Sequence, residues 1–155
     1  MLERRLVTRE TLVPLLQLEV RRDQVGLVAS NAATIAQVAY EPGAEVWGLW
    51  DGDRAVGLMA MIDPQRHPWP EEGDDPQAAF LWRLMIGEEV QGQGYGRAAI
   101  GQVFAQARAW GLPRLVCSVV PDAASALPFY EKLGFRRTGR ILDGEVELLA
   151  DVPAA

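Results

Sequence analysis

The chain has 155 residues, of which 49% are hydrophobic and 23% are charged, and its net charge is −6. This length and composition predict one folded domain over residues 1–155 and exclude a largely disordered chain. The acidic balance argues against a nucleic-acid partner, because such binding depends on clustered lysine and arginine.

Membrane and metal chemistry are not expected either. No apolar run approaches the ~20 residues of a membrane span, and no secretory leader pattern opens the chain. The one cysteine, Cys117, cannot form an intramolecular disulfide, and with the one histidine, His67, it makes a poor zinc site. We interpret His67 as a loop residue and Cys117 as a small hydrophobe of a buried strand. The expected location is the cytoplasm.

Apolar periodicity and turn residues predict an alternation of strands and helices. In chain order we expect a strand over 2–7, a helix over 11–20, a helix over 32–39, strands over 46–50 and 54–62, a loop over 63–77 that is a candidate mobile flap, a strand over 79–86, a helix over 97–110, a strand over 114–120, a helix that ends near Gly134, and strands over 135–141 and 145–151. Ser30 or Asn31 is a candidate N-cap, and Asp51-Gly52-Asp53 and Asp143-Gly144 are hairpin signals. Strands and helices that alternate around one sheet give an α/β (α+β) fold.

A glycine-rich turn separates the strand over 79–86 from the helix over 97–110. Its sequence is Gln91-Gly92-Gln93-Gly94-Tyr95-Gly96, and apolar residues recur at i, i+3, i+4 and i+7 in the helix that follows. Glycines let the backbone approach a ligand, the first N–H groups of a helix lack partners within it, and the helix dipole favours negative charge. The sequence therefore predicts a site for a ligand that carries phosphates.

The turn lacks the residues of two common phosphate motifs. A nucleoside-triphosphate loop needs a lysine beside its last glycine, and the single lysine, Lys132, lies far away. The dinucleotide fingerprint needs a third glycine at position 97, which is Arg97. The pattern that fits is Q-x-x-G-x-G. It resembles the acyl-CoA signature of the GNAT acetyltransferase superfamily, in which backbone amides of this turn hold the CoA pyrophosphate.

A second block extends the resemblance to GNAT enzymes. Residues 126–135, Ala-Leu-Pro-Phe-Tyr-Glu-Lys-Leu-Gly-Phe, are similar to the family's A-x-x-F-Y-x-K-x-G-F. The family's tyrosine lies near the acetyl-CoA sulfur and often protonates the leaving thiolate, and Tyr130 matches it. The alternative is a core aromatic, because Tyr130 shares a helical stripe with Ala126 and Leu127. We favour the catalytic role because the block and the turn occur together.

The resemblance implies acetyl-CoA as co-substrate and a GNAT-like mixed sheet of about six to seven strands with helices on both faces, and no metal is expected, as the cysteine and histidine content indicates. The cofactor-binding residues that it implies lie on the central strand, the turn and the last helix: Leu84, Met85, Ile86, Gln91, Gly92, Gln93, Gly94, Tyr95, Gly96, Arg97 and Phe129. Two residues depart from the family pattern. Ala123 stands where the family usually has asparagine, and Pro128 is tolerated only in a first helical turn, so we expect a late helix start with Ser125 as N-cap.

A narrower resemblance covers nearly the whole chain. The segments over 18–24, 28–32, 39–42, 81–86 and 138–146 look like bacterial polyamine (spermine, spermidine and diamine) N-acetyltransferases. This resemblance implies a small cationic amine, such as spermidine or spermine, as substrate. A homodimer is the candidate assembly.

Two carboxylates near the first predicted helix are candidates for binding that amine. Glu19 falls between Leu12 and Leu16 on a helical wheel, and Asp23 follows at i+4. A carboxylate on a core-facing stripe is costly unless it is paired. Two interpretations stay open: Glu19 and Asp23 line a pocket for an ammonium group, or Glu19 pairs structurally with an arginine such as Arg83.

The predicted activity is acetyl transfer from acetyl-CoA to a primary amine by direct attack in a ternary complex. Backbone N–H groups near residues 84–86 would orient the pantetheine and polarise the thioester carbonyl. An amine with a pKa of about 10 must lose a proton, and Glu19, Asp23, Glu41 and Glu147 are the candidate bases. The alternatives are a non-catalytic acyl-CoA-binding sensor and an acetyltransferase for a protein amine or an aminoglycoside.

Overall fold

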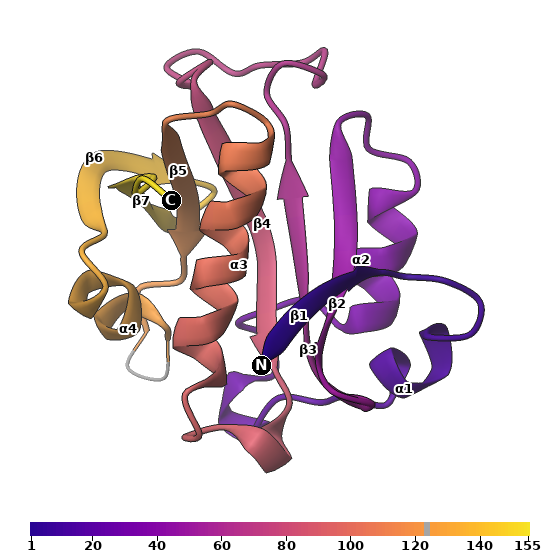
Figure 1. Cartoon of the computed structure of the whole chain (residues 1–155). Helices are drawn as coiled ribbons and strands as arrows, with labels where there is room; N and C mark the ends of the chain where they lie inside the picture. The colour runs from indigo at the N-terminus through magenta and orange to yellow at the C-terminus, as the bar shows by residue number, and fades with distance from the viewer. Residues whose placement is uncertain (123–124) are drawn as a thin grey trace.

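Seven strands form one mixed sheet in the order β1-β2-β3-β4-β5-β7-β6 (Figure 1). The computed structural model describes residues 1–122 and 125–155. The strands are β1 (Leu2–Leu6), β2 (Ala44–Asp51), β3 (Arg54–Ile62), β4 (Ala78–Ile86), β5 (Arg114–Val119), β6 (Arg136–Leu142) and β7 (Glu145–Asp151). Strands β4 and β5 pair in parallel, whereas the other neighbouring strands pair antiparallel. The predicted mixed sheet is confirmed.

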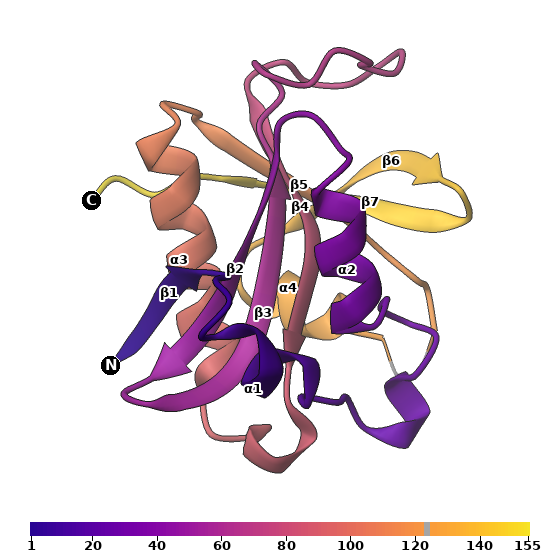
Figure 2. The ribbon, with the colours of Figure 1, turned by 90° about the vertical axis from the view of Figure 1, so that its right-hand side faces the viewer.

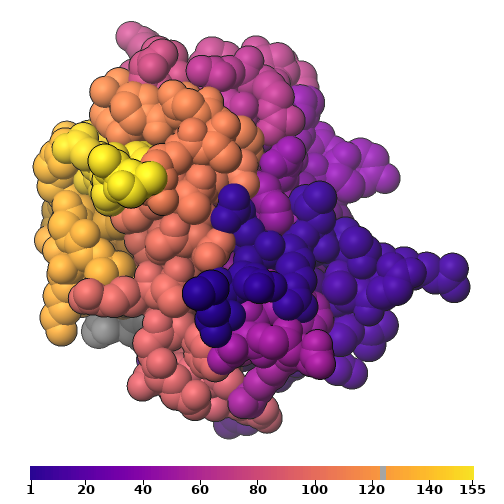
Figure 3. Space-filling view, in the orientation of Figure 1, coloured from indigo at the N-terminus to yellow at the C-terminus, as the bar shows by residue number. Residues whose placement is uncertain are grey.

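Helices cover both faces of this sheet. In the described ranges they are α1 (Leu12–Leu16), α2 (Asn31–Val38), α3 (Tyr95–Ala109) and α4 (Leu127–Lys132), with short 3-10 turns η1 (Arg22–Gln24) and η2 (Glu88–Val90). Helices α1 and α2 contact β2 and β3, whereas α3 contacts β1, β3, β4 and β5 from the opposite face (Figure 2). In Figure 3, α3 lies between the N-terminal segment and the C-terminal segment on the viewer's face. No helix among these is long and apolar enough to cross a membrane.

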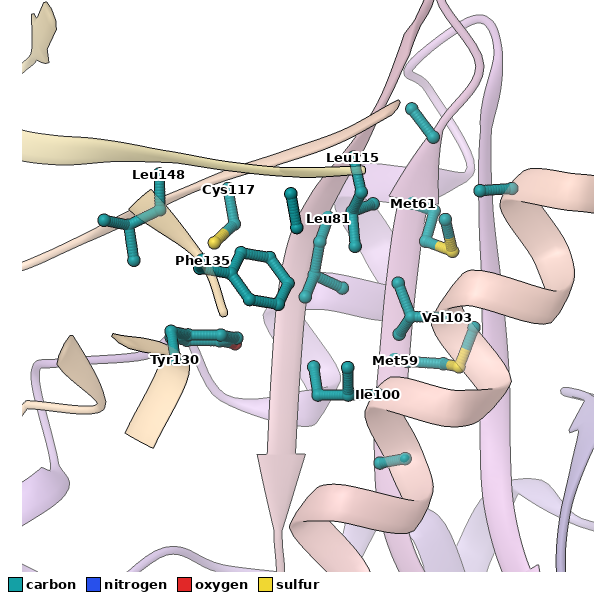
Figure 4. Packing of buried hydrophobic residues seen from close by; sticks show 14 of the residues in the cluster. Met59, Met61, Leu81, Ile100, Val103, Leu115, Cys117, Tyr130, Phe135 and Leu148 are labelled. Carbon is teal, nitrogen blue, oxygen red and sulfur yellow. The ribbon is translucent and has the colours of Figure 1, made fainter. Parts of the chain in front are cut away.

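The main core lies between the sheet and α3. Sheet residues Met59, Met61, Leu81, Leu115 and Cys117 pack in one cluster with Ile100 and Val103 of α3 and with Tyr130 and Phe135 (Figure 4). In β5 every second residue is buried, namely Leu115, Cys117 and Val119. Successive side chains of a strand point to opposite faces. Val116 and Ser118 therefore face away from α3.

Glycine-containing turns close both predicted hairpins. Gly52 has a φ of 58° between β2 and β3, and Asp143 and Gly144 have φ of 50° and 79° between β6 and β7. Positive φ at both central residues is the geometry of a type I′ turn, whose twist matches that of the flanking strands. This second turn makes Glu145 the first residue of β7.

The first helix is shorter than the sequence predicts. It ends at Leu16 rather than near residue 20, and the prediction is wrong for a reason that lies elsewhere in the chain. In a longer helix the carbonyl of Leu15 would accept from the N–H of Glu19. Here the buried Asn31 side chain donates to that carbonyl at 2.8 Å, and the carbonyl of Glu19 accepts from the N–H of Glu88 at 2.7 Å.

The second helix starts as predicted. Ser30 is its N-cap, and the Ser30 hydroxyl accepts a hydrogen bond from the N–H of Ala33 at 3.1 Å. Such a cap satisfies one of the free N–H groups at a helix start. The capping signal in the sequence thus identified the start of α2, and it left Asn31 free to reach back to α1.

Candidate active site

The sheet opens between β4 and β5. The two strands pair over four positions, the last being Leu81 opposite Cys117, although β4 continues to Ile86. The register of β4 against β3 shifts beside Trp82, and such a β-bulge bends its strand. Beyond Leu81, residues 84–86 line a cavity of about 740 Å³ where a paired strand would otherwise lie.

The glycine turn forms one end of this cavity. Gly92 and Gly94 have φ of 77° and 87°, a region that L side chains rarely adopt. A Cβ at either position would have no atom within 4 Å, so the backbone here is open to a ligand. The backbone N–H groups of residues 92–97 donate to no acceptor in the described part of the chain. Consecutive free N–H groups at the start of a 15-residue helix fit a pyrophosphate.

Gly96 is needed for a different reason. A Cβ at Gly96 would lie 3.2 Å from the ring of Phe129, which lines the same cavity. Contacts this short are rare for a real Cβ, so a side chain at 96 would push the Phe129 ring away from the turn. The close approach of α3 to α4 therefore depends on this glycine.

Two side chains of the turn hold the scaffold instead of pointing to a ligand. The Gln91 amide donates to Gln24 Oε1 at 3.0 Å and to the carbonyl of Ile86 at 2.9 Å. The Tyr95 hydroxyl donates to Asp51 Oδ2 at 2.6 Å, and this bond raises the pKa of Tyr95. Ligand contacts of Tyr95 would therefore come from its backbone. Arg97 is exposed and lines the cavity, and Gln93 is exposed beside it.

Tyr130 enters the cavity from α4. It is 6% exposed, and its ring lies at 5.2 Å from that of Phe129 and 5.1 Å from that of Phe135. In Figure 4 its hydroxyl end lies on the side of β4. Burial, followed by the nearby Cys117, raises the pKa of Tyr130 well above the usual value, so its phenol stays protonated as a proton donor. The ring packs in the core, as the alternative interpretation predicts, and the proton-donor role of Tyr130 stays a prediction.

The start of α4 is late, as Pro128 predicts. The N-cap is Ala126 rather than Ser125, and Pro128 lies in the first turn, where its missing N–H costs no helical bond. The Ser125 hydroxyl still accepts from the N–H of Leu127 at 3.2 Å. The departure at Ala123 lies outside the described residues. Pro128 thus leaves Tyr130 facing the cavity.

The sequence profile of the Acetyltransferase (GNAT) family matches residues 14–135, which include the glycine turn and Tyr130. The chain belongs to this family. Relatives named mycothiol acetyltransferase are 35% identical over 104 residues in Rhodococcus jostii and 37% identical over 68 residues in Rhodococcus opacus. These matches cover 63% and 44% of this chain but 33% and 22% of the relatives. The chain therefore spans a third or less of their length, and they do not support the expected closeness to polyamine N-acetyltransferases.

Solved structures share the GNAT fold over nearly the whole chain. An acetyltransferase from Thermus thermophilus has a TM-score of 0.73 at 22% identity, with 97% of this chain and 96% of that chain covered. A Bacillus subtilis acetyltransferase solved in complex with CoA has a TM-score of 0.67 at 16% identity, with 98% of each chain covered. At these identities the likeness shows the fold alone.

Cys117 lines the cavity at the glycine turn and lies at the last position where β4 and β5 pair. It is 2% exposed, and desolvation, followed by the charge of Glu147, raises its pKa to about 12. Thiol reagents attack the thiolate. A pKa of about 12 leaves roughly one thiolate in 10⁴ molecules at pH 8.

We expect native protein at pH 8 to resist alkylation by iodoacetamide, and guanidinium-unfolded protein to be alkylated completely at the one cysteine. Mass spectrometry of the two samples measures this. Rapid labelling of folded protein would show that the strand pair at Leu81 and Cys117 opens readily.

Glu19 and Asp23 do not occupy the places that the helical wheel predicts. Both are exposed, because α1 ends before them, and neither lines the cavity at the glycine turn. Asp23 pairs with Arg21 at 3.2 Å. Arg83 does not pair with Glu19; it donates to Gln37 Oε1 at 3.1 Å and lies over the ring of Trp82. The helical wheel that placed Glu19 on a core-facing stripe is therefore wrong, and the substrate role of Glu19 and Asp23 stays a prediction.

A second cavity of about 770 Å³ lies on the sheet face that Val116 and Ser118 occupy, away from α3. We call it the acidic groove. Six carboxylates line it, against two arginines and one histidine: Glu71, Asp74, Asp75, Asp143, Glu145 and Glu147, with Arg83, Arg140 and His67. The loop over 63–77 forms one wall, and its tip is tied to β6 by the ion pair of Asp74 with Arg140 at 3.2 Å. Mobility of this loop stays a prediction.

Of the predicted bases, Glu147 lines the acidic groove, whereas Glu19, Asp23 and Glu41 line neither of the two cavities described. Glu147 is buried, and it accepts from the Thr138 hydroxyl at 2.8 Å and from Arg140 at 3.0 Å. Glu41 binds the ring of His67 at 2.6 Å, which gives that loop histidine a structural partner. In the ranges 1–122 and 125–155, no three His, Cys, Asp or Glu side chains group as metal ligands.

Proposed function

We propose that this chain transfers the acetyl group of acetyl-CoA to a primary amine. The observation that carries the proposal is one cavity that holds both a row of free backbone N–H groups at the glycine turn and the protonated Tyr130. The first suits a pyrophosphate, and the second suits a leaving thiolate. Membership of the Acetyltransferase (GNAT) family supports the same activity.

Each part of the cavity has its own proposed role. The N–H groups of residues 92–97, with the exposed Arg97, bind the pyrophosphate. The unpaired edge of β4 near residues 84–86 orients the pantetheine and polarises the carbonyl. Acetyl-CoA, when bound, supplies the thioester. Tyr130 gives its proton to the departing sulfur, and Phe129 packs beside the turn.

The proposed acceptor is a small cationic amine, with a polyamine such as spermidine or spermine as the specific candidate. The acidic groove supports it, because six carboxylates against two arginines give the groove a negative field that attracts cations. The exposed Trp69 on its wall adds an aromatic face that can bind a cation. A homodimer and a cytoplasmic location remain proposals.

Mycothiol acetyltransferase activity is the second candidate. It is favoured by the 35–37% identity to relatives of that name, although they are at least three times longer than the region matched. The acyl-CoA sensor and the acetylation of a protein amine or an aminoglycoside are the further alternatives. All of them place acyl-CoA in the same cavity and differ in the acceptor.

We expect free CoA thiol to appear only when an amine is present, and faster with spermidine or spermine than with a monoamine such as butylamine. A thiol-detecting assay over an amine panel, including aminoglycosides and the acceptor of the mycothiol enzymes, measures this. Calorimetric binding of CoA without thiol release from any acceptor would favour the sensor. Equal rates with spermidine and butylamine would remove the polyamine proposal and keep the acetyltransferase.

A further inference from the structure

The cavity at the glycine turn, which we call the cofactor cavity because it is proposed to hold acetyl-CoA, meets the acidic groove at a short boundary. Trp82, Arg83, Ser118 and Glu145 line both. They lie just past the last paired residues of β4 and β5, where the sheet opens from one face to the other. If acetyl-CoA occupies one cavity and the amine the other, as the proposed function requires, the reacting atoms meet here.

Glu145 is the one carboxylate among the described residues that lines both cavities. It is half-buried at the start of β7, and the Ser118 hydroxyl donates to its Oε1 at 3.3 Å. A single neutral hydrogen bond leaves most of the acceptor capacity of a carboxylate unused. Glu145 therefore has oxygen atoms available to an ammonium group.

The other carboxylates of the groove either have hydrogen-bond or ion-pair partners already or lie away from the boundary. Glu147 is held by Thr138 and Arg140, Asp74 by Arg140, and Asp75 by Arg114 through two hydrogen bonds. Two more lie on the exposed rim and do not reach the boundary: Glu71 and Asp143.

We propose that Glu145 is a catalytic residue that binds the acceptor ammonium and removes its proton. This role rests on the proposed function. It assigns the base to Glu145, whereas the sequence analysis named Glu19, Asp23, Glu41 and Glu147 as candidates. An ammonium with a pKa of about 10 is mostly protonated at neutral pH and cannot attack a carbonyl in that form. A carboxylate at the boundary supplies both attraction and a proton acceptor.

Arg83 lines the same boundary, and its positive charge interacts with the Glu145 carboxylate. Burial lowers the pKa of Arg83, whereas the charge of Glu145 raises it. The Nε atom of Arg83 is buried without a hydrogen-bond partner among the described residues. The first cavity also has four other titratable groups: Tyr130 from α4, Cys117 from β5, and Tyr95 and Arg97 from the start of α3. The groove has seven others: Glu147, Asp143 and Arg140 from the hairpin, and His67, Glu71, Asp74 and Asp75 from the loop.

The step balances with these residues. Glu145 takes one proton from the ammonium and releases it to solvent through the groove. The freed nitrogen lone pair forms the C–N bond while the C–S bond breaks. Tyr130 gives its proton to the sulfur, and the surplus proton of the nitrogen restores the Tyr130 phenol through solvent. The net products are an acetamide, a thiol and one proton.

The test is Glu145→Gln, which keeps the shape and the hydrogen bond from Ser118. We expect kcat/KM for spermidine at pH 7.5 to fall by about 10²-fold or more. Free amine increases about tenfold per pH unit below its pKa, so the deficit should shrink steadily between pH 7.5 and 9.5. A residue that only holds the fold would give a deficit independent of pH, together with a lower Tm.

Asp151→Asn is the matched control, a carboxylate at the exposed end of the same strand and outside both cavities. It should match wild type in rate and pH profile, and calorimetry should give all variants the wild-type affinity for CoA. If Glu145→Gln does not fold, Glu145→Asp replaces it and should keep the wild-type pH profile at a reduced rate. Wild-type kcat/KM in a folded Glu145→Gln, or a deficit that pH does not relieve, overturns the inference while the acetyltransferase stands. Absence of amine-dependent thiol release from wild type overturns the proposed function itself.

Discussion

Tyr130→Phe should lower kcat by about 10²–10⁴ and leave the affinity for CoA close to that of wild type. The change keeps the ring that packs against Phe129 and Phe135 and removes only the hydroxyl that faces the cavity. The departing thiolate then lacks its proton donor, while the pyrophosphate contacts at the turn are untouched. Steady-state kinetics with the best amine of the panel, and calorimetry with CoA, measure the two quantities.

Tyr40→Phe is the control for this change, because Tyr40 is 88% exposed and lines neither cavity. It should match wild type in kcat. Equal kcat in Tyr130→Phe and wild type would reduce Tyr130 to a core aromatic, the alternative that its sequence stripe allowed. A lower Tm with proportionally weaker CoA binding would indicate lost packing instead of lost chemistry.

The pH dependence of kcat gives a further test of Tyr130 as the proton donor. Burial raises the pKa of Tyr130 above its usual value, so the proton-donating form persists to higher pH than for a free tyrosine. Any loss of kcat that reflects ionisation of Tyr130 should therefore begin above about pH 10. A kcat that falls with rising pH well below this point would have to come from another group, and Tyr130→Phe would retain that fall.

The sequence was sufficient to predict structural features that depend on residues close together in the chain. Positive φ at Gly92 and Gly94 and the type I′ turn at Asp143-Gly144 are demands that only a few residue types meet, so their presence can be interpreted directly. Pro128 likewise fixed the late start of α4 within a residue of its prediction. Each of these features depends on neighbours within a few positions.

The candidate acceptor site could not be predicted because distant contacts decide it. The end of α1 is set by Asn31, 16 residues beyond the carbonyl that it occupies, and this contact places Glu19 outside the helix. The wheel argument treated residues 11–20 as one helix and had no means to detect the competing amide. Glu145 reaches the boundary between the two cavities because β7 pairs with β5 and because β4 separates from β5 past Leu81.

The glycine turn can be tested as the pyrophosphate site by adding a negative charge to it. Gly94→Asp should weaken CoA binding at least tenfold, about 1.4 kcal/mol, as measured by calorimetry. The Cβ itself would meet no atom of the protein, so the added group projects into the space that the pyrophosphate would occupy. Its negative charge lies beside the free N–H groups of the turn and opposes the ligand's own charge.

Backbone strain has to be separated from charge, because Gly94 has a φ of 87° and any side chain there is strained. Gly94→Asn provides the comparison: asparagine has nearly the same shape as aspartate, tolerates positive φ better than most residues, and is neutral. CoA affinity should therefore fall in the order wild type, Asn variant, Asp variant, and the gap between the two variants should narrow at high salt. If both variants fold, as judged by Tm, and the Asp variant binds CoA as tightly as wild type, the turn does not hold the pyrophosphate. Equal losses in the two variants would instead assign the effect to the backbone of the turn.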